Sequence, residues 1–253
     1  MKFVFDLDGT ICFKGKPLSH LMVKALDSLV EKGFDLVFAS ARPIRDLLPI
    51  LPPHLQQCLM VGGNGAFMAE GGRIVSTVSF DSNTADAIMA LIHKYEADYL
   101  VDSRWDYSFS GSLDHPIRVN IDPEQRAKAV PLEQLNEMVK AVILRSFNQQ
   151  EVMEELKKLP VVLYRHGNED IIDISPQHIN KWTGLQKLGV MSGEFIAFGN
   201  DANDISMFQH AVHSVCVGEH PELLRVATEQ VQSDEGAVIE KISELQMLLS
   251  QGA

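Results

Sequence analysis

The sequence predicts an α/β fold, in which a core with a parallel sheet is interrupted by a smaller inserted α/β domain. Two observations carry this prediction. Near both ends of the chain, short apolar segments of strand length alternate with longer segments of helical periodicity. Between residues 82 and 177 the character changes, and this stretch holds strands and helices of its own. We therefore expect residues 1–81 and 178–253 to form the core and residues 82–177 to form the inserted domain.

Composition narrows the class of protein. The 253 residues are 45% hydrophobic and 22% charged, as in soluble globular proteins, and no apolar run approaches the ~20 residues of a membrane span. The start of the chain has no signal-peptide pattern and the three cysteines are scattered, so we expect a cytoplasmic protein with reduced thiols. A net charge of −12 without a block of Lys or Arg argues against nucleic acid or an anionic membrane as partner. A small phosphorylated metabolite stays compatible with these data, and the oligomeric state is open.

The first strand is followed by an acidic turn. Residues 3–5, Phe-Val-Phe, predict a buried strand, and Asp6-Leu7-Asp8-Gly9-Thr10 follows it directly. Alternation points Asp6 and Asp8 the same way and turns Leu7 into the core. Two neighbouring carboxylates repel each other unless a cation intervenes, and Mg²⁺ prefers such oxygen ligands. Gly9 permits an unusual turn and Thr10 offers a hydroxyl to a phosphate, although an acidic turn that merely ends a strand is the simpler alternative.

A second polar turn follows the next strand. Residues 17–33 have helical periodicity and end at a glycine, and residues 34–39 predict a second buried strand, which makes a parallel strand–helix–strand unit. This strand ends in Ser40-Ala41-Arg42-Pro43. A Ser hydroxyl at that point can bind a phosphoryl oxygen, or it can simply cap the next helix.

The third strand, over residues 59–61, leads into a glycine-rich turn around Asn64. The turn lacks the full spacing of a dinucleotide-binding loop or P-loop, which argues against nucleotide binding there. Residues 73–78 alternate as a strand that leads outward to the insertion.

The inserted region has no readable motif. We expect a helix around Ile88 and Ile92, further helices over residues 134–139 and 152–159, and strands over 99–101, 142–144, 161–164 and 171–174. The polar and aromatic residues between them that could determine specificity are Arg104, Trp105, Tyr107, His115 and Arg118.

The return to the core brings two further polar segments. Lys181 opens a helix, where its charge opposes the helix dipole unless a phosphate lies nearby, although a solvated surface lysine is the ordinary alternative. Residues 195–198 predict a buried strand that runs into Gly199-Asn200-Asp201-Ala202-Asn203-Asp204 and then a helix. For this segment alone, helix capping by Asn and Asp is the alternative. A last strand over residues 214–218 and helices over 221–227 and 237–249 close the core.

These four segments, in this order, resemble the four motifs of the haloacid dehalogenase (HAD) superfamily of phosphohydrolases. Ser-Ala-Arg-Pro is similar to the Thr-Gly-Arg-Pro of its Cof-type sugar phosphatases, and an insertion between the second and third motifs resembles the larger α/β cap of this group. The resemblance implies a Rossmann-like core with an α/β cap. One position departs from it, because Asn200 stands where the family usually has its first aspartate of the fourth motif.

The resemblance also implies roles for individual residues. Asp6 would be the nucleophile, Asp8 the general acid and base, and Lys181 the neutralising cation. Gly9, Thr10, Ser40, Ala41 and Arg42 would bind phosphate, and Asn64 would lie beside the substrate. Mg²⁺ would be held by Asp6, Asp8 through its carbonyl, Asn200 and Asp204, with Asp201 in the same cluster or in place of Asn200.

The resemblance thus implies a Mg²⁺-dependent phosphatase that hydrolyses phosphate monoesters of small metabolites, sugar phosphates above all, through an aspartyl-phosphate. Two alternatives stay open. The phosphoryl group could pass to a sugar instead of water, as in a phosphotransferase or mutase, or the chain could be a non-catalytic module that binds a phosphorylated ligand.

Overall fold

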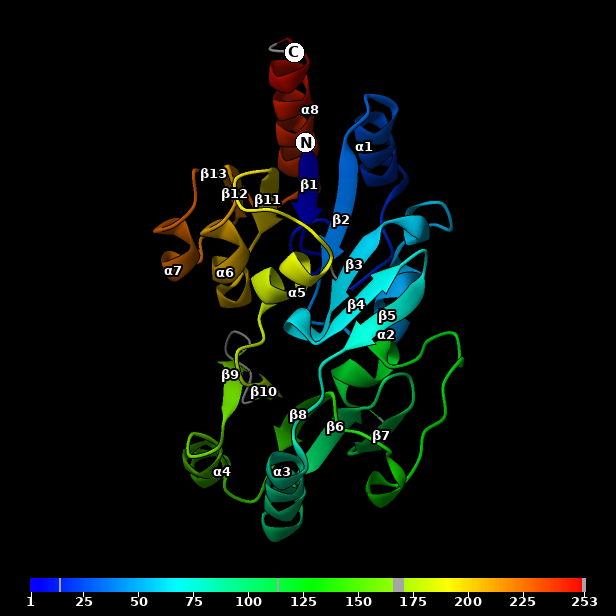
Figure 1. Ribbon diagram of the computed structural model, residues 1–253, viewed down its shortest axis with the longest axis vertical. Coiled ribbons are helices and arrows are strands. Elements are labelled where there is room, and N and C mark those ends of the chain that lie inside the picture. The colour runs from blue at the N-terminus through cyan, green and yellow to red at the C-terminus, as the bar shows by residue number, and fades with distance from the viewer. Residues whose placement is uncertain (14, 113, 166–170, 252–253) are drawn as a thin grey trace.

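The chain folds around two separate sheets, each in its own half of the molecule (Figure 1). The structure is a computed structural model that describes residues 1–13, 15–112, 114–165 and 171–251. No helix within these ranges is both long and apolar enough to cross a membrane. The predicted fold class, an α/β core with an inserted α/β cap, is confirmed.

The core comes from both ends of the chain. Its strands are β1 (Lys2–Phe5), β2 (Asp35–Ala39), β3 (Leu59–Gly62), β4 (Phe67–Glu70), β5 (Arg73–Thr77), β11 (Phe195–Gly199), β12 (His213–Val217) and β13 (Glu229–Val231). Its helices are α1 (His20–Glu31), α2 (Ile44–Leu47), α5 (Lys181–Lys187), α6 (Ile205–Phe208), α7 (Pro221–Leu224) and α8 (Glu235–Gln251), with short 3₁₀ turns η1 (Leu48–Ile50), η2 (Leu55–Gln57), η3 (Gly63–Gly65) and η6 (Ala202–Asp204).

The eight strands of the core sheet lie in the order β13-β12-β11-β1-β2-β3-β4-β5. Neighbours from β13 to β3 run parallel, and β4 and β5 form an antiparallel edge. The carboxyl ends of β11, β1 and β2 therefore meet at one edge of the sheet, which is where open α/β sheets bind ligands.

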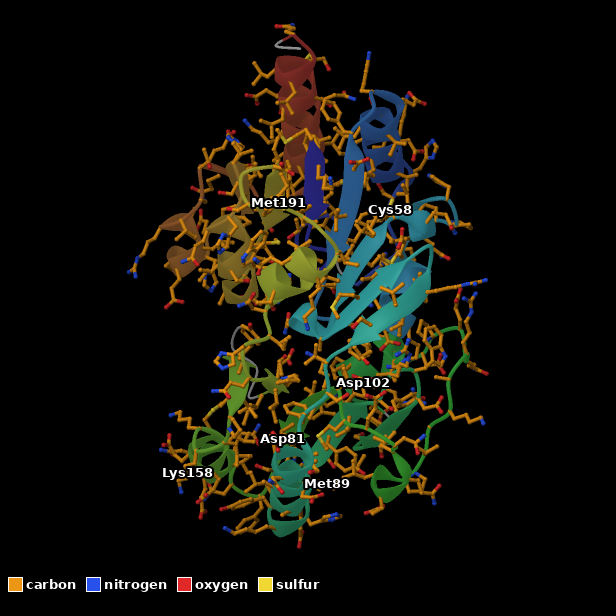
Figure 2. All side chains as sticks on the ribbon, in the orientation of Figure 1. Cys58, Asp81, Met89, Asp102, Lys158 and Met191 are labelled. Atoms are coloured by element: carbon orange, nitrogen blue, oxygen red, sulfur yellow. The ribbon has the colours of Figure 1, made fainter. Side chains whose placement is uncertain are left out.

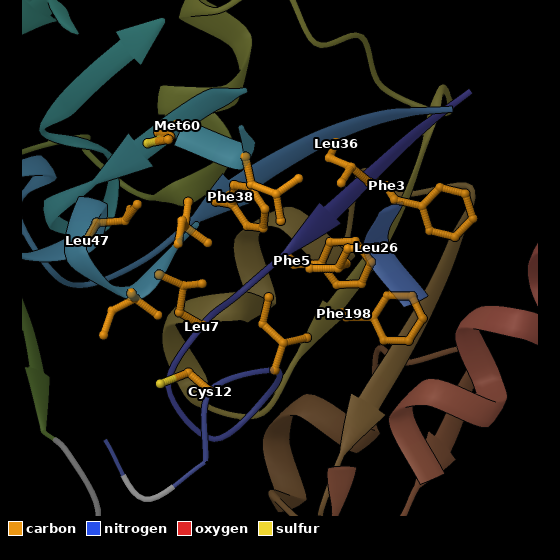
Figure 3. Close-up of a cluster of buried hydrophobic side chains, with 14 of the residues drawn as sticks. Phe3, Phe5, Leu7, Cys12, Leu26, Leu36, Phe38, Leu47, Met60 and Phe198 are labelled. Atoms are coloured by element: carbon orange, nitrogen blue, oxygen red, sulfur yellow. The ribbon is translucent and has the colours of Figure 1, made fainter. Parts of the chain in front are cut away.

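Alternation along β1 divides the core into two packed layers. Phe3 and Phe5 face α1 and α8, and Val4 faces α5, α6 and α7 on the opposite side. Figure 3 shows Phe5 and Phe198 side by side, with ring centroids 5.0 Å apart. Leu7 is fully buried in the same layer, as the alternation predicts. These apolar faces fix the position of the acidic turn that follows β1.

The cap lies between β5 and α5 and packs helices on one face of its sheet. Its strands are β6 (Asp98–Asp102), β7 (Tyr107–Ser110), β8 (Lys140–Arg145), β9 (Val161–Arg165) and β10 (Ile172–Pro176), and its helices are α3 (Ser82–Lys94) and α4 (Gln149–Leu156), with 3₁₀ turns η4 (Pro116–Asn120) and η5 (Leu132–Gln134). The antiparallel order is β7-β6-β8-β10-β9. Val101, Ala141 and Ile143 pack against α3 and α4, so the alternate residues of these strands face the other side.

One predicted element of the cap is wrong. Residues 135–139 form no helix, although Leu135 and Met138 have helical spacing. The Met138 carbonyl accepts a hydrogen bond from Phe80 N at 2.9 Å, and Val139 N donates to the Asp102 carbonyl at 2.8 Å. The segment thus joins Phe80, which leads from the core into the cap, to Asp102 of the cap sheet. In a helix these backbone groups would bond to each other's turns and both of these hydrogen bonds would be lost.

Two chain crossings connect the core to the cap. At the first, the Asp81 carboxylate caps α3 by accepting from Thr84 N at 3.0 Å (Figure 2). At the second, Ile179 already packs with the core residues. We therefore propose the division into residues 1–81 plus 178–253 and residues 82–177.

Candidate active site

The candidate site is built where β1, β2 and β11 end. Asp6 follows β1, Ser40 follows β2, and Asn200 follows β11, while Lys181 is the first residue of α5. Because the three strands run parallel and adjacent, their ends bring these residues together. The local cap of α5 supports the placement of Lys181, since the Asn180 side chain accepts from Thr183 N at 2.9 Å.

Lys181 lies between two buried carboxylates. Its Nζ donates to Asp6 Oδ1 and to Asp204 Oδ1, at 2.6 Å each. Lys181 and Asp204 are fully buried, and Asp6 is 5% exposed. Burial alone would lower the pKa of Lys181, but the carboxylates of Asp204 and Asp6 outweigh it and raise this pKa. The lysine is therefore a permanent cation in contact with the predicted nucleophile.

Burial has the opposite effect on Asp6. It raises the pKa of this carboxyl group to about 7, against the lowering effect of Lys181. Thr10 Oγ1 donates to Asp6 Oδ2 at 2.8 Å, so both carboxylate oxygens have a donor. A further positive charge beside Asp6 would favour its ionised form.

In the turn after β1, two backbone N–H groups bond to carbonyl oxygens of the same turn. Gly9 N donates to the Cys12 carbonyl at 2.9 Å, and Thr10 N donates to the Leu7 carbonyl at 3.1 Å. Gly9 has φ +82°, and a Cβ there would lie 2.2 Å from Asn200 Nδ2. Glycine is thus required both by the backbone conformation and by the side chain that crosses it.

Asp8 faces Arg42. Arg42 Nε and Nη2 donate to the two Asp8 oxygens at 2.7 and 2.6 Å, which forms a bidentate ion pair. The Ser40 hydroxyl, which is buried, accepts from Arg42 N at 3.1 Å across Ala41. The two predicted phosphate turns are therefore joined through Asp8, whose side chain is 45% exposed.

Asn200 covers the oxygen atoms of the acidic turn. Its amide has two orientations that differ by a half-turn. In one, Nδ2 donates to Asp6 Oδ2 and the Asp8 carbonyl, at 3.1 Å each. In the other, Oδ1 takes that place and accepts from Thr10 Oγ1 at 3.3 Å.

With the amide oxygen inward, this oxygen lies about 3.1 Å from both Asp6 Oδ2 and the Asp8 carbonyl oxygen. This is close to the roughly 2.9 Å between adjacent ligands in an octahedral Mg²⁺ shell. The residues present thus fit a magnesium ion whose protein ligands are Asp6, the Asp8 carbonyl and Asn200.

The two aspartates that follow bond elsewhere. Asp204 Oδ2 accepts from Asn200 N and Asp201 N, at 2.9 and 3.1 Å, while its other oxygen accepts from Lys181. Asp201 Oδ1 accepts from Ala202 N at 2.7 Å and lies 3.4 Å from His220 Nε2. In this arrangement Asp204 shapes the loop that presents Asn200.

Asn64 is fully buried beside the site with φ 56°. Its Nδ2 donates to Asp173 Oδ2 of the cap at 3.2 Å, and its Oδ1 accepts from Asn203 Nδ2 at 2.9 Å. Asn64 therefore joins the segment 199–204, which follows β11, to the cap sheet.

A cavity of about 590 Å³ extends from these turns to the cap. The charged residues that line it are Asp8, Arg42, Asp46, Asp102, Lys140 and Asp173, and the apolar ones include Leu100, Ile117, Ile121, Val142, Leu144 and Ile171. The cavity is of the size of small-molecule sites, and it places Asp8 and Arg42 opposite the cap sheet.

Of the five cap residues that the sequence singles out, His115 lines the cavity. The other four have structural contacts. Arg104 donates to the Ile74 carbonyl, Trp105 donates to the Arg126 carbonyl, and the guanidinium of Arg45 lies 4.6 Å above the Tyr107 ring. Arg118 lies over the Phe109 ring at 5.6 Å.

Sequence reasoning missed the charged residues of the cap sheet. Asp102 is the last residue of β6, Lys140 is the first of β8, and Asp173 lies within β10, and each is next to apolar residues of its strand. All three are at most 3% exposed. A charged residue beside apolar strand residues could have indicated a buried polar site, because buried charges require partners.

Comparisons with known proteins agree with the geometry. A family model described as haloacid dehalogenase-like hydrolase matches residues 3–242. Among curated relatives, a phosphoglycolate phosphatase of Methanosarcina mazei is 28% identical over 89% of this chain and 88% of its own, and an HMP-PP phosphatase of Serratia proteamaculans is 25% identical over 90% and 87%.

Solved structures share the fold. A haloacid dehalogenase-like hydrolase from B. subtilis superposes with a TM-score of 0.79 at 19% identity, and covers 97% of this chain and 100% of its own. A sugar phosphatase of HAD subclass IIB superposes with a TM-score of 0.76 at 18% identity, over 96% and 98%.

Proposed function

Because this chain belongs to the haloacid dehalogenase-like hydrolases, we propose that it is a Mg²⁺-dependent phosphatase that cleaves monoesters of small metabolites through a phosphoryl group on Asp6. Family membership confirms the expected class, a HAD-type phosphohydrolase. The substrate, the metal and the covalent step are the proposal. The observation that carries it is the contact of Lys181 with Asp6 inside a buried site.

In the first step, a carboxylate oxygen of Asp6 attacks phosphorus and the ester P–O bond breaks. Lys181 lowers the pKa of the buried nucleophile and offsets the charge that gathers on the phosphoryl oxygens. Asp8 gives its proton to the departing alkoxide, which leaves as an alcohol. For this, Asp8 must separate from Arg42, whose guanidinium is then available to the phosphate.

In the second step, the Asp8 carboxylate takes a proton from water, and the water oxygen attacks the phosphorus of the acyl phosphate. The bond between phosphorus and Asp6 breaks, so inorganic phosphate leaves and Asp6 returns as a carboxylate. The Ser40 hydroxyl, which accepts from Arg42 N, would bind a phosphoryl oxygen in both steps.

We propose Asp6, the Asp8 carbonyl and Asn200 as the protein ligands of Mg²⁺, with Asp204 holding the loop. Bound there, the ion would supply positive charge to the phosphoryl oxygens and to Asp6. The spacing of about 3.1 Å from the Asn200 amide position to both Asp6 Oδ2 and the Asp8 carbonyl oxygen supports this assignment. The contacts of Asp201 with Ala202 and His220 favour Asn200 as the ligand.

Hydrolysis of 4-nitrophenyl phosphate tests the proposal. We expect turnover with Mg²⁺, its loss with a chelator, and at least about a thousandfold lower kcat in Asp6→Asn, since the nucleophile is removed. Cys12→Ser is the matched control, because burial raises the pKa of this nearby thiol to about 12 and leaves it unreactive. Full activity of folded Asp6→Asn would overturn the mechanism.

A further inference from the structure

One face of the cap sheet forms a wall of the 590 Å³ cavity. Alternate residues of β6, β8 and β10 point to this side, because the residues between them pack against α3 and α4. The wall has a polar part, with Asp102, Lys140 and Asp173, and an apolar part, with Leu100, Val142 and Leu144.

The polar part lies at the end of the sheet nearest the core. Asp102 is the last residue of β6, and its Oδ1 accepts from Arg45 Nη2 of the core at 2.9 Å. Figure 2 labels Asp102 at the level where core and cap meet. Lys140, the first residue of β8, is its direct partner across the two strands. The apolar residues follow farther from the core, and Leu100, Val142 and Leu144 form one cluster with Ile121.

Asp102 has an unused acceptor. Its side chain is fully buried, and Oδ2 has no hydrogen-bond partner among the residues that the structure describes. An unsatisfied buried oxygen is costly and calls for a donor. Lys140 donates to Asp173 Oδ1, which uses one of the three protons of its ammonium group. Cross-strand partners have Cβ atoms about 4.5–5.5 Å apart, so the side chains of Asp102 and Lys140 are neighbours on this face of the sheet.

We propose that Asp102 and Lys140 bind a hydroxyl group of the substrate, and that the substrate is the phosphate ester of a hydroxylated chain with an apolar or planar group at its far end. A hydroxyl can donate to Asp102 Oδ2 and accept from Lys140 Nζ at once. The apolar cluster then receives the far end of the leaving group. This inference rests on the proposed function, because the same cavity holds the leaving group.

The carboxylates around the cavity also disfavour substrates that carry a further negative charge. Asp102 and Asp173 stand in the wall together with Lys140, and Asp46 of α2 lines the cavity beside them. A leaving group with its own carboxylate would meet more negative than positive charge there. Short acidic phosphates should therefore be poorer substrates than hydroxylated ones.

Three phosphate esters test the proposal with Mg²⁺ present. Flavin mononucleotide has a hydroxylated chain with a planar ring, sorbitol 6-phosphate has the chain alone, and phenyl phosphate has a ring without hydroxyls. We expect wild-type kcat/KM for flavin mononucleotide to exceed that for each of the others at least about tenfold, since both parts of the wall contribute.

Asp102→Asn replaces the acceptor by an amide that can present a donor to the cavity while its oxygen still faces Arg45. It should lower the ratio of kcat/KM for flavin mononucleotide to that for phenyl phosphate by about 10- to 150-fold. Asp122→Asn is the matched control and should leave this ratio unchanged. Asp122 is also a buried carboxylate of the cap, but its oxygens accept from Arg126 N and Ala127 N in a loop.

The inference is overturned if the wild type prefers phenyl phosphate, or if Asp102→Asn lowers all three kcat/KM values by one factor. Should Asp102→Asn not fold, the wild-type ratios decide alone. The Asp6→Asn variant distinguishes a failure of the proposed function from a failure of the inferred hydroxyl site. If it retains activity, the proposed function fails, whereas unchanged ratios in an Asp6-dependent enzyme refute only the assignment of Asp102 and Lys140.

Discussion

We propose that Asn200 determines how strongly the site binds a divalent cation. Its amide supplies an oxygen ligand without charge, at the position where the family usually has a carboxylate. Asn200→Asp should therefore lower the Mg²⁺ concentration for half-maximal activity at least about tenfold, because the added charge lies beside the ion. A titration of activity with Mg²⁺ measures this.

Asp201→Asn is the control for this titration. Its carboxylate is engaged with Ala202 N and His220, so its loss should change the half-saturating Mg²⁺ concentration far less. If instead Asp201→Asn abolishes the response to Mg²⁺ and Asn200→Asp leaves it unchanged, Asp201 is the ligand.

Asp6 should make the metal-free protein less stable as the pH rises. In the unfolded chain its carboxyl ionises with the ordinary pKa of 3.8, but burial raises the pKa in the folded state to about 7. Between these values the folded state binds more protons, so stability falls as the pH increases from about 4 to 7. The cost above pH 7 reaches up to about 4 kcal/mol.

Urea denaturation of metal-free protein at pH 5 and pH 8 tests this sign. Asp6→Asn should be more stable than the wild type at pH 8 and should lose this part of the pH dependence, because Lys181 keeps Asp204 as its partner. Added Mg²⁺ should stabilise the wild type more than the variant. Lower stability of Asp6→Asn at pH 8 would contradict the raised pKa.

The order of the motifs predicted which of these residues lie close together, but it did not predict all of their contacts. The motif residues Asp6, Thr10, Lys181 and Asp204 do meet, because the ends of parallel strands and the start of α5 bring them together. That Asp8 would face Arg42, or that Asp102 would line the cavity, depends on side-chain directions that spacing along the chain does not specify.

Helix α2 connects the phosphate turn to the cap. Arg45 is 4% exposed and donates to Asp46 of its own helix, to Asp102 of β6 and to the Trp105 carbonyl. Arg45→Met should destabilise the protein by about 3–5 kcal/mol, because it leaves two buried carboxylates without their cation. Urea denaturation measures the loss, and a change below about 1 kcal/mol would show that this contact contributes little.

The elements of the core follow from apolar periodicity, since the central strands β1, β2, β3, β11 and β12 are mostly buried on both faces. The cap was harder to predict. The helix expected over residues 134–139 is absent, because Met138 and Val139 use their backbone groups to bond Phe80 and Asp102. Strand β7 lies in a polar, turn-rich stretch, and its pairing with β6 decides its conformation.

For the whole molecule, we propose that the chemistry lies in the core and that the cap selects the substrate. Cavity residues from both meet around Asp8, Arg42 and Asp102. If water is the acceptor, phosphate and alcohol should form in equal amounts at any concentration of added sorbitol. Release of less phosphate than alcohol, with a matching yield of sorbitol phosphate, would show a phosphotransferase instead.

The most direct test of the mechanism is to locate the phosphoryl group. Wild-type enzyme is mixed with Mg²⁺ and a fast substrate, quenched in acid, and mapped by peptide mass spectrometry. We predict one added phosphoryl group on Asp6, in the peptide that contains residues 3–10. A phosphoryl group on another residue, together with normal turnover by Asp6→Asn, would contradict the assignment of Asp6 as the nucleophile.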